Sequence, residues 1–150
     1  MHDSGVRRKR FGLLLTGLTV LFALRVAGQA VQRWIPQSFL PTVDAFQGSN
    51  RPYSTLLTIQ LLILGLLIRS SWRVWSGRSL PLPPLGRGLA WFGAIYLTGS
   101  ILRIDVGMWV SNAHSWFSAW IPAFFHLVLA FWVLVLSAYH LPPFERRDDA

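Results

Sequence analysis

The sequence predicts an all-α integral membrane protein, a single domain (residues 1–150) built as a four-transmembrane-helix bundle. The chain is 53% hydrophobic and only 13% charged, a balance that is rare in a soluble domain of this size. It contains four apolar runs, and one of them, residues 115–139, has no Asp, Glu, Lys or Arg. Most of the basic residues stand at the ends of these runs. The net charge of +8 therefore indicates membrane topology and contact with membrane lipids, with no nucleic acid as partner.

The four transmembrane helices are expected at about residues 11–33, 54–75, 88–110 and 115–139. The first follows a leader, MHDSGVRRKR, that ends in four consecutive cations. A signal peptide also begins this way, but this apolar run is long and no small-residue cleavage site follows it, so we expect a helix. A proline-rich outer loop is expected at 34–53. The segment 76–87 is expected to be a cytoplasmic loop, because its GRSLPLPPLGR sequence is too rich in proline for a helix.

The distribution of Lys and Arg predicts that both termini are cytoplasmic. Ten of these residues fall in the leader, the second-to-third connection with its helix end, and the tail, against two, Arg33 and Arg51, on the other side. The expected location is a bacterial inner (cytoplasmic) membrane. Small multidrug exporters and fluoride channels are also short four-span chains, but many insert in both orientations. The exporters also carry a membrane-embedded glutamate, whereas Glu145 in the tail is the only glutamate here.

Several polar residues fall within the expected spans, where a charged side chain costs about 2.5–3.5 kcal/mol on insertion scales. Arg25 and Arg103 lie at similar depth in two spans that run in the same direction, and Gln29 and Gln60 fall near that level. These side chains either reach the outer head groups or bridge helices, or they form a pocket for an anionic or carbonyl-bearing amphiphile such as a quinone or a lipid. The candidate ligand-binding residues are Arg25, Gln29, Gln60, Arg103, Asp105 and His126.

Asp105 is two residues from Arg103, so on a straight helix the two side chains point to different faces. We expect Asp105 to reach another helix, at Arg25 or His114. His126 lies in the fourth run with small neighbours that include Pro122. It is either a helix-to-helix hydrogen-bond partner or the axial ligand of a haem or chlorophyll-type ring; no other metal site is expected. Quinone, pigment and haem all remain open as cofactors.

Small residues form a stripe on the first helix, nearly opposite Arg25. If Arg25 faces the bundle interior, this stripe faces another chain, either a second copy or another membrane subunit; if Arg25 points outward, the stripe packs internally. The expected helix-packing positions are Gly12, Thr16, Thr19, Ala23, Ala27, Ala119 and Ala130.

The second span ends in Gly65-Leu66-Leu67-Ile68-Arg69, after Pro52-Tyr53 at its start and Gln60 within it. In these features, and over spans one and two, the chain resembles the DoxX-type small membrane proteins. That resemblance implies a four-span bundle with cytoplasmic termini. It also implies a link to quinone-dependent oxidoreductases, which some relatives serve as membrane subunits. Gln60 stands where such proteins often carry an acidic residue.

The function expected from the sequence is that of a non-catalytic membrane subunit or scaffold that binds lipid or another flat hydrophobic ligand. The alternative is a quinone-handling or electron-transfer subunit. The chain has no cysteine, which excludes disulfides, thiolate metal sites and thiol redox chemistry. It has no HExxH, GxSxG or P-loop motif either, so we do not expect the protein to be an enzyme.

The predicted orientation can be tested by single-cysteine labelling, since the natural chain has no cysteine to remove. Cysteine at Ser49 should react with a membrane-impermeant reagent in intact cells, and cysteine at Ser79 should react only after the membrane is opened. Labelling of position 79 from outside would reverse the orientation.

Overall fold

The structure is a computed structural model that describes residues 2–47, 52–109 and 120–141. All regular structure within these ranges is helical, and no strand occurs in them. The elements are α1 (His2–Trp34), α2 (Val43–Gln47), α3 (Tyr53–Trp75), α4 (Pro83–Trp109) and α6 (Trp120–His140). The four longer helices are long and apolar enough to cross a membrane. The all-α class and the four apolar helices are thus confirmed.

Two helices begin earlier than the sequence pattern predicts. The first includes the basic leader from His2 onward, because Arg and Lys are good helix formers and nothing there interrupts the helix. The third long helix begins at Pro83, inside the expected loop 76–87. Proline is tolerated in a first helical turn, where its missing N–H would have no partner in the helix. Residues 115–119 of the expected fourth span lie outside the described residues.

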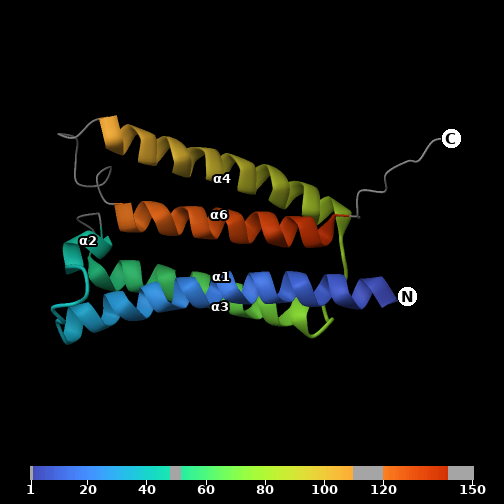
Figure 1. Cartoon of the computed structure of the whole chain (residues 1–150), viewed down its shortest axis with the longest axis horizontal. Helices are drawn as coiled ribbons and strands as arrows, with labels where there is room; N and C mark the ends of the chain where they lie inside the picture. Colours follow the sequence, from blue (N-terminus) through green and yellow to red (C-terminus); the bar gives the residue numbers. More distant parts are fainter. Residues whose placement is uncertain (1, 48–51, 110–119, 142–150) are drawn as a thin grey trace.

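The long helices pack in the order α3, α1, α6, α4, each against the next, with the most extensive contact between α4 and α6 (Figure 1). The helix α1 begins, and α6 ends, at the same end of the molecule. We call this the basic end, because it carries Arg7 to Arg10 together with Arg69, Arg73, Arg78 and Arg87. The short helix α2 lies at the opposite end against α1 and α6, and we call this the α2 end.

Small residues allow α4 to approach α6 closely. A Cβ atom added at Gly93 would lie 2.7 Å from Cδ2 of Leu134, and the Ser137 hydroxyl donates a 2.8 Å hydrogen bond to the Gly86 carbonyl. Small buried residues recur at seven-residue intervals on both helices, which keeps them on one face. The repeat comprises Gly86, Gly93 and Ser100 on α4, and Ala123, Ala130 and Ser137 on α6.

A polar contact joins α1, α3 and α6 within their shared apolar core. The Thr19 hydroxyl donates to the Leu15 carbonyl at 2.7 Å, lies 3.1 Å from the Ser71 hydroxyl, and accepts a 3.1 Å hydrogen bond from the Trp132 indole. Around it pack the core side chains Leu15, Phe22, Val26, Leu67, Val74, Trp132 and Tyr139.

Further hydrogen bonds join the helix ends at the basic end. Arg7 donates to the carbonyls of Ala138 and Leu141, at 3.0 and 2.7 Å, and so satisfies acceptors that the end of α6 leaves open. The backbone amide of Leu82 donates to Nδ1 of His140 at 3.1 Å. The first turns of the chain are thereby fixed to its last described helix.

The close approach of α4 to α6 predicts different outcomes for two glycines. Gly93→Leu should lower stability by about 1–3 kcal/mol, because the added atoms must displace Leu134 and Val133. Gly99→Leu is the matched control, since a Cβ there meets nothing within 4 Å. Thermal unfolding in mild detergent measures both, and equal stability of the two variants would contradict the packing described.

Candidate functional site

A cavity of about 320 Å³ lies between α4 and α6. Figure 1 shows the two helices diverging toward the α2 end, where this cavity is found. Most of its lining comes from one face of α4, at spacings of three and four residues, and Gly99 leaves space in the middle of that face. The lining residues are Phe92, Ile95, Tyr96, Gly99, Ser100, Arg103 and His126.

One wall of the cavity is polar. The Tyr96 hydroxyl and Nδ1 of His126 lie 2.5 Å apart in a hydrogen bond, and the two rings meet edge to face. The Ser100 hydroxyl donates back to the Tyr96 carbonyl at 2.8 Å. Arg103, one turn farther toward the α2 end, is only 7% exposed. Hydroxyl, imidazole and guanidinium groups therefore line one small space.

The other wall is apolar and open to the side. Phe92 stacks on Tyr96 with ring centroids 5.9 Å apart, yet it is 58% exposed, and Ile95 is 70% exposed. Phe92 lies eleven residues before Arg103, or about 16 Å along a helix. The cavity thus has a charged group near the α2 end and an apolar opening that extends toward the middle of α4.

A second polar group lies between α1 and α3. Gln60 donates a 3.0 Å hydrogen bond to Oε1 of Gln29, and both side chains are buried. Among the described residues, Nε2 of Gln29 and Oε1 of Gln60 have no hydrogen-bond partner. The nearby Arg25 donates to the Phe46 carbonyl at 3.2 Å and lies over the Phe125 ring, 5.3 Å from its centroid.

Arg25 and Arg103 approach α6 from opposite neighbouring helices. Arg25 contacts Phe125 of α6. Arg103 lines a cavity together with His126, the residue that follows Phe125. The two arginines therefore lie at similar levels along α6. Of the two, Arg103 lines the cavity between α4 and α6 and Arg25 is not part of that lining. Of the candidate ligand-binding residues, the structure brings Arg103 to His126 and Gln29 to Gln60.

Asp105 is exposed and accepts a 3.2 Å hydrogen bond from the Trp109 indole, one turn along its own helix. The expected contact of Asp105 with His114 involves a residue outside the described ranges. His126 uses Nδ1 for its hydrogen bond to Tyr96. The metal of a haem or chlorophyll-type ring would therefore have to be ligated by Nε2.

The expected helix-packing positions differ in how far they are buried within the chain. A Cβ added at Gly12 would lie 2.8 Å from the Trp75 ring, and Thr19 lies in the core. Thr16 and Ala27 are exposed and Ala23 is half-buried. Ala130 is completely buried within the chain. Ala119 lies outside the described residues.

Two residues of the cavity, Tyr96 and Ser100, were not among the candidates derived from the sequence. Their spacing from Arg103, with Ser100 four residues after Tyr96 and Arg103 three residues later, places all three on one helical face. That spacing could have identified them as one polar face in an apolar helix.

Comparison with family models, with curated proteins and with solved structures finds no match to this chain. The resemblance to DoxX-type proteins therefore stays a prediction. The functional argument depends on the geometry of the site itself.

The Gln29–Gln60 contact predicts a non-additive mutational pattern. Gln29→Leu should lower stability by about 1–3 kcal/mol, because it leaves the buried amide of Gln60 without its partner. Gln29→Leu combined with Gln60→Leu should cost less than the sum of the single changes, since both polar groups are then removed. Unfolding of the four proteins in mild detergent measures the coupling, and strictly additive effects would show that the amides do not interact.

Proposed function

We propose that the chain is a multi-pass membrane protein with both termini in the cytoplasm. In this proposal it is a non-catalytic membrane subunit or scaffold that binds an amphiphile in the cavity between α4 and α6. The observation that supports the proposal most directly is the pairing of a polar wall, at Tyr96, His126 and Arg103, with an apolar opening at Phe92 and Ile95. A soluble polar ligand would not need that opening.

The polar wall suits an anionic or carbonyl-bearing head group. A guanidinium forms strong charge-assisted hydrogen bonds with a phosphate or carboxylate, and these are stronger where water is excluded. Tyr96 and His126 are already hydrogen-bonded to each other, so their orientation is fixed before a ligand arrives. This arrangement favours holding a head group in place.

The position of the cavity suits an amphiphile that belongs to one leaflet. With the termini in the cytoplasm, the α2 end is the outer end, and Arg103 lies six residues from the last residue of α4 at that end. A head group at Arg103 would then lie near the outer membrane surface, and its tail would follow Ile95 and Phe92 toward the membrane centre. In this arrangement the direction from the amphiphile's head group to its tail is the one expected for a molecule of the outer leaflet.

A quinone-handling subunit is the second candidate function. The specific observation in its favour is that the aromatic rings of Phe92, Tyr96 and His126 line the same cavity as Arg103, so a flat ring could stack while its carbonyl accepts a hydrogen bond. The first candidate takes lipid in the same place. The extracted molecule distinguishes the two.

The test compares two arginine variants of protein purified in mild detergent. Arg103→Gln should reduce the bound amphiphile about tenfold or more, because a hydrogen bond to a charged group contributes about 1.5–3 kcal/mol. Arg25→Gln is the matched control: it also removes an arginine at a similar level, but not one that lines the cavity. Organic extraction with mass spectrometry measures occupancy and identity.

Each outcome of this experiment has a distinct meaning. Extracted phospholipid supports the first function, and extracted quinone supports the second. An absorption band of a haem or chlorophyll-type ring would replace both with a pigment or haem protein in which His126 is the ligand. If no molecule is extracted, or if both variants retain the same amount, the cavity is not an amphiphile site.

A further inference from the structure

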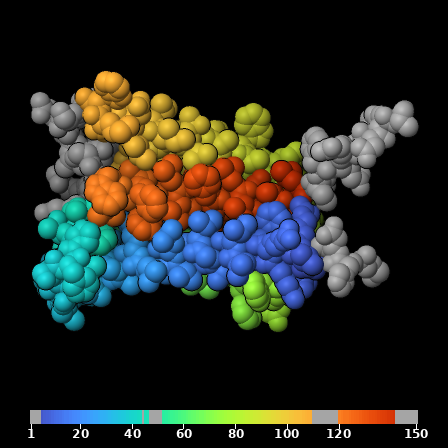
Figure 2. Space-filling view, viewed as in Figure 1, coloured from blue at the N-terminus to red at the C-terminus, as the bar shows by residue number. Residues whose placement is uncertain are grey.

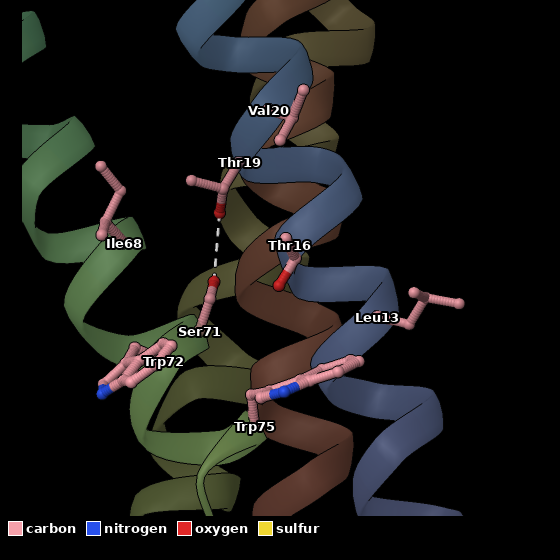
Figure 3. A pocket seen from close by; sticks show the side chains of 8 residues that line it. All are labelled: Leu13, Thr16, Thr19, Val20, Ile68, Ser71, Trp72 and Trp75. Atoms are coloured by element: carbon pink, nitrogen blue, oxygen red, sulfur yellow. Dashed lines mark hydrogen bonds between the residues drawn. The ribbon is translucent and has the colours of Figure 1, made fainter.

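A second cavity, a groove of about 330 Å³, lies between α1 and α3, on a different pair of helices from the proposed α4–α6 site. Figure 3 shows Leu13, Thr16 and Val20 along its α1 side and Ile68, Trp72 and Trp75 along its α3 side. On α3 these residues belong to the half nearer the basic end, and on α1 they extend from that half to the middle of the helix. The groove is therefore at the opposite end of the molecule from Arg103.

The groove offers an occupant almost no polar group. The two hydroxyls at its back, Thr19 and Ser71, are hydrogen-bonded to each other, as the dashed line in Figure 3 marks. Thr19 also receives the Trp132 indole proton, so its hydrogen-bonding capacity is already used. Apart from the Thr16 hydroxyl, what remains is an apolar channel suited to a hydrocarbon chain.

Tryptophans bound the groove toward the basic end. The Trp75 ring reaches from α3 toward α1 (Figure 3). A Cβ atom added at Gly12 of α1 would collide with this ring. Trp72 is 60% exposed beside it. Tryptophan is typical of the boundary between hydrocarbon and head groups, where its ring lies among apolar groups and its N–H can donate to an ester carbonyl.

Exposed cations stand just beyond these tryptophans. Lys9 precedes Leu13 by four residues and Thr16 by seven, so it lies on the groove's own face of α1, one turn nearer the basic end. Arg10, also exposed, is turned about 100° away from that face. A negative head group at Lys9 would thus lie directly in line with the groove.

From this alignment we propose that the groove binds an acyl chain of an anionic phospholipid whose phosphate lies at Lys9. Along the groove, the apolar channel is followed by the tryptophans and then by the cation. This order matches that of the acyl chain, the ester and the phosphate in such a lipid. The lipid belongs to the leaflet at the basic end, so this site is separate from the amphiphile site proposed between α4 and α6.

The test offers purified protein equal amounts of phosphatidylglycerol and phosphatidylcholine with identical acyl chains. Native mass spectrometry then counts the lipids retained. The natural chain should retain one phosphatidylglycerol in preference to phosphatidylcholine. Lys9→Gln should reduce that retention about fivefold, and Arg10→Gln, with the same loss of charge on the same helix, should change it little.

A groove-filling variant makes the test independent of charge. Thr16→Phe places a ring in the groove from an exposed position and should abolish the retained lipid, while Arg103→Gln should leave it unchanged. Equal retention of both lipids, or equal effects of Lys9→Gln and Arg10→Gln, would overturn the proposal. A dimer that Thr16→Phe dissociates would also overturn it, by showing a protein helix in the groove.

Discussion

The arrangement of the helices depends on the hydroxyl of Thr19. Its single proton goes to the Leu15 carbonyl, so Ser71 must be the donor in their contact, and the Trp132 indole supplies a second donor. One side chain on α1 thus uses both acceptor positions of its hydroxyl to hold α3 and α6 in register. Within an apolar core such bonds have direction, which apolar contacts lack. The space-filling view shows α1 packed along the length of α6, where this contact is buried (Figure 2).

The packing of α4 follows from a different constraint, the seven-residue repeat of small side chains. Near the basic end, Gly86 and Gly93 bring the helix backbones together. Toward the α2 end, Tyr96 and His126 place two rings between the same helices, and Gly99 supplies no side chain to fill the space beside them. The cavity lies where these rings stand beside the small residues Gly99 and Ser100. The site and the helix contact are two parts of one interface.

The fold class could be predicted from the sequence because hydrocarbon-spanning helices leave a strong compositional signal, and all four long helices carry it. The start of α4 at Pro83 could not be predicted, since proline both interrupts helices and begins them. Arg103 and His126 were identified because polar groups in apolar helices are conspicuous. Tyr96, which lines the same cavity, was not identified, because an aromatic residue is common in an apolar helix. The separation of Arg25 from Arg103 by α6 also escaped prediction, since sequence gives depth along a helix but not the order of helices around it.

The contact between Thr19 and Trp132 joins residues 113 positions apart in the chain. During synthesis, α1 and α3 emerge before α6 and can pair through Thr19 and Ser71. Until then, one acceptor position of Thr19 and the guanidinium of Arg7 lack the partners that α6 provides. The helix α6, the last one in the described residues, therefore completes the packing of α1. A chain interrupted before Trp132 would leave the matching surface of α1 exposed to other components of the membrane.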